Sequence, residues 1–365
     1  MSVAFSVKTS DSIRTKSRRE RRKNYEDKSL HSSEQRIRDG DKEVNAKTNE
    51  DLVSQIQSIP IKDERDSRSL VVEDVPKFLP LTCLDFLRRG FFSTRLLLGE
   101  GRFGKVFLGK ENTSGSLVAI KVFKKATEFE CAVRETRILA ALSETGIVPK
   151  FFGLVDLSNV RFGWMRGHLN VGAVVQFVGD TMKQRTITLY SAITASRRQP
   201  VNVRNMLHWA RLMQKLAVKL AKLHKLGLCF NDLHLKNIVL TGAIQQDPDV
   251  YLVDVGKVSF SNSQHAYRHY VIPRLRQLYK RRFPQHGPEI WEGQKFSTKS
   301  DVYSFGFILK CAKLGKLLGV TNLMEGCLAA VPRERPTMGE VVEKLNQRVR
   351  ALEMMERIER FESQF

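Results

Sequence analysis

The sequence predicts an α+β fold in which strands come first and helices follow. Short apolar runs separated by turn residues occupy residues 95–123, and an amphipathic stretch with one apolar face covers residues 203–225. Helical spacing of apolar residues dominates beyond Gly179. A hydrophobic fraction of 42% is enough for a sizeable core, and 365 residues suit one large domain or two ordinary ones.

Residues 1–75 are expected to be a disordered tail. They hold 16 Lys or Arg against 15 Asp or Glu with few aromatic residues, so they cannot bury enough apolar surface to offset chain entropy. A basic cluster at residues 16–23 is compatible with a nuclear-localisation or nucleic-acid patch, or with a solvated charge run. Most of the net charge of +22 therefore belongs to residues 76–365, which favours acidic partners, nucleic acid or an anionic surface, and is equally compatible with a basic solvated face.

The composition also indicates a compartment. No apolar run approaches the roughly 20 residues that a membrane helix needs, and the N-terminus lacks a secretory signal. The five cysteines form no C-x-x-C pair, which is typical of reduced thiols in an intracellular protein. We expect a cytoplasmic protein without a membrane span, and the basic cluster leaves the nucleus open.

The elements are predicted in chain order. Residues 78–87 suggest a short helix, and residues 95–123 three strands with turns at Gly101 and at residues 112–115. A helix is expected over residues 127–143, then strands at residues 151–155 and 171–178. The clearest helix covers residues 203–225.

A glycine-rich turn lies between two of these strands. Gly99, Gly101 and Gly104 lack a Cβ, so backbone N–H groups there can approach a phosphate chain. Residues 118–121, Val-Ala-Ile-Lys, follow on the next strand and place Lys121 where it can neutralise the same phosphates. Because a strand follows the glycines rather than a helix, the pattern resembles the ATP-binding lobe of eukaryotic protein kinases.

Further motifs in the order used by that family extend the resemblance over about residues 92–350. Residues 230–237 (Phe-Asn-Asp-Leu-His-Leu-Lys-Asn) resemble the kinase catalytic loop, and residues 254–256 (Asp-Val-Gly) resemble its metal-binding motif. Gly287-Pro288-Glu289, Asp301 and Arg335 resemble structural residues of the large lobe, where Arg335 pairs with Glu289 and Asp301 braces the catalytic loop. The implied fold is a bilobal protein-kinase fold over residues 76–365, with a small β-rich lobe at about 92–178 and a larger helical lobe at about 179–350.

The resemblance also implies roles for individual residues. Lys121 would contact the phosphates of ATP and be held by Glu135, which fits the helix pattern better than Glu128 or Glu130. Asp232 would accept the proton of the substrate hydroxyl, and Lys236 would assist it. Asn237 and Asp254 would bind Mg²⁺, which favours oxygen ligands. The remaining ATP contacts would come from the three glycines, from Val106 and Ala119 against the adenine, and from backbone groups of Gln176 to Val178.

The chain departs from the family at several points, among them Phe230, which replaces a histidine. Asn231 replaces the arginine that receives an activation-loop phosphate in the family, so activity is not expected to depend on that switch. Val255 replaces a phenylalanine, although Phe230, Val255 and Leu139 can still form an apolar stack. His234 stands where serine/threonine kinases carry a lysine, and it is either a functional residue or a polar loop residue.

The sequence is compatible with three functions. The expected one is an active kinase that uses ATP and Mg²⁺ and modifies a protein, with serine or threonine favoured over tyrosine. The alternatives are a pseudokinase that serves as a nucleotide-binding scaffold and a small-molecule phosphotransferase, against which Asp301 and Gly287-Pro288-Glu289 argue. Basic and aromatic residues alternate between Gly256 and Gly287, which favours acidic protein substrates and, less simply, nucleic acid.

Overall fold

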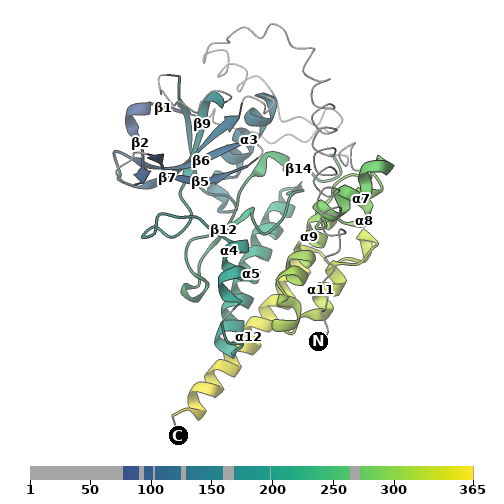
Figure 1. The fold of residues 1–365 in the computed structure, drawn as a ribbon. Coiled ribbons are helices and arrows are strands. Elements are labelled where there is room, and N and C mark those ends of the chain that lie inside the picture. Colours follow the sequence, from purple (N-terminus) through teal and green to yellow (C-terminus); the bar gives the residue numbers. More distant parts are fainter. Residues whose placement is uncertain are drawn as a thin grey trace, which may run out of the picture. The chain divides into compact units, whose positions relative to one another are not determined.

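The computed structural model describes residues 77–89, 94–101, 103–124, 129–158, 168–197, 199–263 and 272–364. The disordered tail and the basic cluster expected within residues 1–75 lie outside these ranges. Strands dominate the described residues up to Gln176 and helices dominate those after Thr188, as Figure 1 shows. The predicted α+β fold is therefore confirmed.

The large sheet has the strand order β1-β8-β9-β7-β6-β2, and β5 pairs with β6 beside this path. Its strands are β1 (Phe78–Leu79), β2 (Leu84–Phe86), β5 (Leu97–Glu100), β6 (Gly104–Glu111), β7 (Leu117–Lys124), β8 (Phe151–Asp156) and β9 (His168–Gln176). Side chains alternate between the two faces of a strand. Val118, Ile120 and Val122 of β7 are buried in one apolar cluster, so Lys121 lies on the opposite face.

The prediction of a short helix at residues 78–87 is wrong. Pro80 separates β1 from a 3-10 turn, η1 (Leu81–Cys83), and β2 follows directly. Backbone pairing decides this conformation, because β1 lies parallel to β8 and β2 lies antiparallel to β6. Leu84 is buried against the sheet, so pairing and burial together outweigh the local helix propensity of the leucines.

Shorter pairs of strands lie outside the large sheet. They are β3 (Arg88–Arg89) with β4 (Thr94–Arg95), β11 (Leu228–Cys229) with β14 (Ser259–Phe260), and the order β10 (Ile187–Thr188), β12 (Ile238–Leu240), β13 (Val250–Leu252). β12 and β13 flank the predicted catalytic loop and the predicted metal-binding motif. They therefore bring the two motifs to one end of a small sheet.

The helices are α3 (Phe129–Leu142), α4 (Leu189–Ser196), α5 (Val203–Lys225), α7 (Pro273–Arg282), α8 (Pro288–Trp291), α9 (Thr298–Cys311), α10 (Leu314–Leu317), α11 (Thr321–Cys327) and α12 (Met338–Glu362). The 3-10 turns after η1 are η2 (Ser143–Thr145), η3 (Ile244–Gln246), η4 (Val255–Lys257) and η5 (Pro332–Glu334). The helix predicted at residues 203–225 is confirmed. It begins after Asn202, whose side chain accepts the N–H of Asn205, and it ends with three basic residues that suit the helix dipole.

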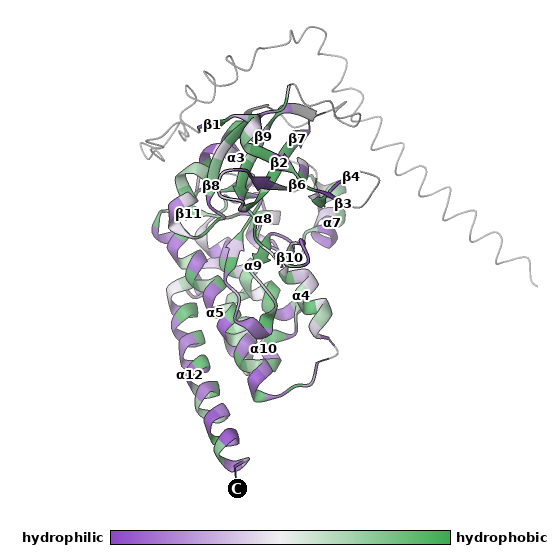
Figure 2. Ribbon diagram, turned by 90° about the vertical axis from the view of Figure 1, so that its left-hand side faces the viewer, coloured by the Kyte–Doolittle hydropathy of each residue, from purple (hydrophilic) through white to green (hydrophobic). Residues whose placement is uncertain are grey.

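Apolar contacts join α5, α9 and α12 into one core cluster with the loops around β12 and β13. Figure 2 shows apolar residues concentrated on the strands of the large sheet, whereas polar and apolar residues alternate along α12. None of the helices in the described ranges is both long enough and apolar enough to cross a bilayer.

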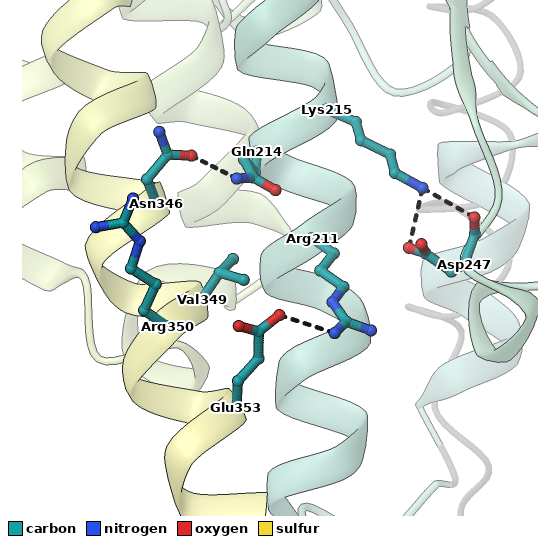
Figure 3. Close-up of a pocket in the computed structure, with 8 residues that line it drawn as sticks. All are labelled: Arg211, Gln214, Lys215, Asp247, Asn346, Val349, Arg350 and Glu353. Atoms are coloured by element: carbon teal, nitrogen blue, oxygen red, sulfur yellow. Dashed lines mark hydrogen bonds and ion pairs between the residues drawn. The ribbon is translucent and has the colours of Figure 1, made fainter.

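A polar pocket lies between α5, α12 and the residues next to η3 (Figure 3). Gln214 donates to Asn346 across the two helices. Arg211 pairs with Glu353 at 2.8 Å in the same seam, and Lys215 pairs with Asp247 at 2.9 Å. Six of the polar side chains that line the pocket thus pair with one another, and we assign it a structural role.

Candidate active site

The glycine-rich turn joins β5 to β6. Gly101 donates its N–H to the carbonyl of Gly104 at 2.9 Å, which closes the turn. A Cβ added to Gly104 would lie 2.5 Å from the Val122 carbonyl oxygen, so the close approach of β6 to β7 requires glycine there. Gly99 and Gly101 have open space where a Cβ would stand, which leaves room for a ligand beside the turn.

Lys121 joins two acidic residues that are distant in the sequence. Its ammonium pairs with Glu135 of α3 and lies 3.0 Å from Oδ1 of Asp254. Burial opposes the charge on this ammonium, but the carboxylates of Glu135 and Asp254 outweigh that effect and raise the pKa of Lys121. The amine is therefore a fixed cation at physiological pH.

Helix α3 is anchored to the segment that follows Asp254. Arg134 Nη2 donates to the carbonyl of Val258 at 2.9 Å. A Cβ on Gly256 would lie 3.5 Å from Oε2 of Glu135, so the backbone of η4 runs directly against this carboxylate. These contacts place Glu135 next to Lys121, whereas the side chains of the two rival glutamates lie outside the described residues.

Asp301, at the start of α9, holds the backbone of the predicted catalytic loop. Its carboxylate is 1% exposed and accepts the N–H of Phe230 at 2.6 Å and that of Asn231 at 2.9 Å. His224 Nε2 lies 3.0 Å from the same group. Asn231 adopts a left-handed backbone conformation with φ of 65°, and the two N–H bonds stabilise this turn.

Asp232 is buried beside two nitrogen-bearing side chains. Lys257 Nζ lies 2.8 Å from its Oδ2, and His234 Nε2 lies 4.0 Å from its Oδ1. Burial lowers the pKa of His234, so its imidazole is neutral at physiological pH. Sequence reasoning missed Lys257, although its position directly after the Asp-Val-Gly motif was a visible signal.

Asn237 joins the catalytic loop to the metal-binding motif. Its Nδ2 donates to the Asp232 carbonyl at 3.1 Å, and its own carbonyl accepts the N–H of Val253 at 3.0 Å. The next residue, Asp254, has a left-handed backbone with φ of 61°. The side-chain oxygens of Asn237 and Asp254 are the hard ligands that Mg²⁺ prefers.

Lys236 is not brought into this cluster. It is exposed, and its ammonium lies 5.8 Å from the ring centroid of Tyr190 on α4. Among the described residues, the lysine paired with Asp232 is therefore Lys257, and the role predicted for Lys236 has no geometric support.

The residues expected to face the adenine lie on neighbouring strands. Half-buried Val106 stands on β6 and buried Ala119 on β7. Gln176 ends β9, where its N–H donates to the Lys150 carbonyl at 2.7 Å, and Val178 follows, buried, two residues later. The N–H of Gln176 is therefore already used at the end of β9 and is not available to a nucleotide.

The structural residues of the helical part behave as expected. Arg335 and Glu289 form a buried bidentate pair with distances of 2.8 and 2.7 Å, so this prediction is confirmed. Phe230, Val255 and Leu139 are all buried in the large apolar cluster of the helical part, and their expected stacking stays a prediction.

Comparisons with known proteins agree with this geometry. A family model described as the protein kinase domain matches residues 92–320. The chain is 26% identical over 308 residues to the high affinity nerve growth factor receptor of Mus musculus, covering 74% of this chain and 36% of the receptor. It is 27% identical over 278 residues to the serine/threonine-protein kinase pkn2 of Myxococcus xanthus, covering 72% of this chain and 30% of that kinase. The chain thus spans about a third of the length of these relatives. The order of the motifs, the lysine–glutamate pair and the family match together show that this chain belongs to the protein kinase family.

Proposed function

We propose that this chain is an active protein kinase that transfers the γ-phosphate of ATP to a serine or threonine hydroxyl of a protein. The observation that carries the proposal is the double ion pair of Lys121 with Glu135 and Asp254. One amine thereby links the sheet, α3 and the metal-binding motif. The charged groups that would hold a nucleoside triphosphate therefore lie next to one another.

The residues present fit ATP and Mg²⁺. Asp254 has a side chain that is 36% exposed although it is bonded to Lys121, so one of its oxygens remains accessible to a cation. Asn237 uses its amide nitrogen toward the Asp232 carbonyl, which leaves its side-chain oxygen for a metal. Mg²⁺ held by Asp254 and Asn237 would neutralise negative charge on the phosphates of ATP.

The protein's own part in the reaction is positioning. The substrate hydroxyl oxygen forms a bond to the γ-phosphorus as the bond from that phosphorus to the bridging oxygen of ADP breaks, and the hydroxyl proton passes to Asp232. Asp301 and Asn237 hold the loop that carries Asp232. Lys121 offsets the charge of the bound phosphates.

The substrate we propose is an acidic protein. Helix α7 carries five basic residues among its ten, namely Arg274, Arg276, Lys280, Arg281 and Arg282. A concentration of one charge sign raises the local concentration of oppositely charged partners. The basic-aromatic positions between residues 264 and 271 lie outside the described residues. The preference for serine or threonine rests on the motifs around Asp301 and Arg335, since the relatives include both growth factor receptors and a serine/threonine kinase.

The test is transfer of label from γ-labelled ATP with Mg²⁺ by the full chain. Wild type is compared with Lys121→Met and Asp254→Asn, and Lys344→Met on the exposed side of α12 serves as the matched control. Acidic casein and basic histone serve as substrates. We expect label on casein above histone, lost in both site variants and unchanged in the control, with phosphoserine or phosphothreonine after hydrolysis.

Two outcomes would overturn the proposal. Label that persists in both site variants would show that the activity does not belong to this site. If wild type transfers no label and yet ATP raises its melting temperature, the pseudokinase alternative replaces the enzyme. Phosphotyrosine as the product would refute only the serine/threonine assignment.

A further inference from the structure

Lys257 is the strongest feature of the site that the motifs do not explain. It ends η4, three residues after Asp254, and its ammonium lies 2.8 Å from the carboxylate of Asp232. The side chains of the pair are 21% and 10% exposed, so the contact is shielded from bulk water. Shielding makes such an ion pair stronger than an exposed one.

The backbone of Lys257 is tied to the catalytic loop. Asn231 Nδ2 donates to the Lys257 carbonyl at 2.8 Å and to Ser259 Oγ at 2.9 Å. Asn231 itself is held through its N–H by Asp301. Asn231 therefore makes a permanent, uncharged link at the position where the family carries a phosphate-binding arginine.

The two basic side chains of the catalytic loop differ from Lys257 in charge or in position. His234 is neutral because burial lowers its pKa, and its Nε2 lies 4.0 Å from the carboxylate. Lys236 lies against the ring of Tyr190. Within the described part of the chain, the ion pair of Asp232 is made by Lys257.

We propose that Lys257 is a catalytic residue, namely the cation that contacts the transferring phosphoryl group and orients Asp232 toward the substrate hydroxyl. This assignment rests on the proposed kinase function. Negative charge spreads over the phosphoryl oxygens as the bond to ADP breaks, and a fixed cation in a shielded site stabilises that charge without reorganisation. The proton of the hydroxyl goes to Asp232, so Lys257 takes no part in the proton transfer. Asn231 is a positioning residue that acts through Lys257.

The amine of Lys257 reaches Asp232 from η4, the segment that follows Asp254, and not from the catalytic loop itself. A lysine two residues after Asp232 would reach it from the loop itself, but His234 stands there. The site thus takes its cation from the segment after Asp254, which also carries a predicted metal ligand. One short segment then controls both the metal position and the charge beside the base.

The experiment measures kcat and KM for ATP of the full chain with casein. Lys257→Met should lower kcat by ~100-fold, the scale of losing one preorganised charge-stabilising donor, with KM for ATP within about threefold of wild type. The double variant Lys257→Met with His234→Lys returns a lysine from the loop side and should recover about tenfold in kcat. Lys344→Met, an exposed lysine on α12, is the control for loss of one positive charge.

The positioning role of Asn231 is tested by non-additivity. Asn231→Ala should lower kcat in wild type, and it should have a much smaller effect when Lys257 is already methionine. A purely structural role of Asn231 would lower kcat equally in both backgrounds. Melting temperatures of all variants exclude unfolding as the cause.

Several results would overturn the assignment. If Lys257→Met keeps wild-type kcat, or if the His234→Lys rescue fails, Lys257 is not the phosphoryl-contacting cation. If Lys257→Met raises kcat, the amine blocks Asp232 instead of assisting it. If wild type transfers no phosphate, the proposed function fails and this assignment fails with it, whereas an active wild type with an equally active Lys257→Met refutes this assignment alone.

Discussion

Replacing Asp301 by asparagine tests how the catalytic loop is held. The Asp301 carboxylate, which is 1% exposed, accepts the N–H groups of Phe230 and Asn231 and lies 3.0 Å from His224 Nε2. Asparagine keeps one acceptor oxygen but turns an NH₂ group toward one of these donors. Losing one bond to a charged group (about 1.5–3 kcal/mol) and stranding a buried N–H (about 1–3 kcal/mol) together give an expected loss of about 2.5–6 kcal/mol.

Urea unfolding followed by tryptophan fluorescence measures this loss, and the kinase assay measures its consequence. Because Asp232 follows Asn231 directly, a shifted loop should also lower kcat by about 10- to 100-fold. Asp247→Asn is the matched control, since Asp247 pairs with Lys215 at the surface and should change stability by less than about 0.5 kcal/mol. If Asp301→Asn unfolds at the same urea concentration as the control, the carboxylate does not hold the loop and this reasoning is refuted.

Three further predictions concern stability and nucleotide binding. Arg335→Met leaves the buried Glu289 carboxylate without its partner and should lower the free energy of unfolding in urea by about 3–5 kcal/mol. Adding Glu289→Met should restore much of that loss, and an equal loss in the single and double variants would contradict this reasoning. Burial lowers the pKa of His286 to about 3, so below pH 6.5 the unfolded chain binds a proton that the folded chain does not. The free energy of unfolding should therefore fall by about 2 kcal/mol between pH 6.5 and 4.5. His286→Phe should flatten that pH dependence, and an unchanged slope would assign it to other groups. Gly104→Ala puts a Cβ 2.5 Å from a backbone oxygen of the next strand, so it should cost about 1–3 kcal/mol of stability and weaken the ATP-induced rise in melting temperature. Gly101→Ala meets open space and is the control, and identical melting temperatures of the two variants would refute the packing argument.

Much of the fold and many site residues could be predicted from the sequence because their signals are local. The turn residues at Gly101 and residues 112–115 separate strands whose apolar alternation is visible in the chain, and β5, β6 and β7 lie where expected. The apolar face of residues 203–225 predicts α5 with the bounds that the structure shows. The order of the glycine turn, Asp232, Asn237 and Asp254 also carried the resemblance to the protein kinase family, which the family match confirms.

The failures have physical reasons that lie outside local patterns. The leucines of residues 78–87 favour a helix, but the edges of the sheet offer unpaired backbone groups. Pairing of β1 with β8 and of β2 with β6 therefore outweighs the helix propensity. The family resemblance assigned Lys236 to the site, and the structure places it at an exposed loop position with its ammonium 5.8 Å from the ring centroid of Tyr190.

The sequence by itself determined the fold class, the family resemblance and the residue types available for phosphoryl transfer, because strand alternation, helix periodicity and motif spacing are properties of neighbouring residues. Only the tertiary structure decided which charges meet. Lys121 lies 133 residues from Asp254 in the chain, and Lys257 reaches Asp232 through a left-handed turn at Asp254 and a hydrogen bond from Asn231. Such pairs depend on how separate segments pack, and packing is set by the whole core rather than by the residues that form the pair.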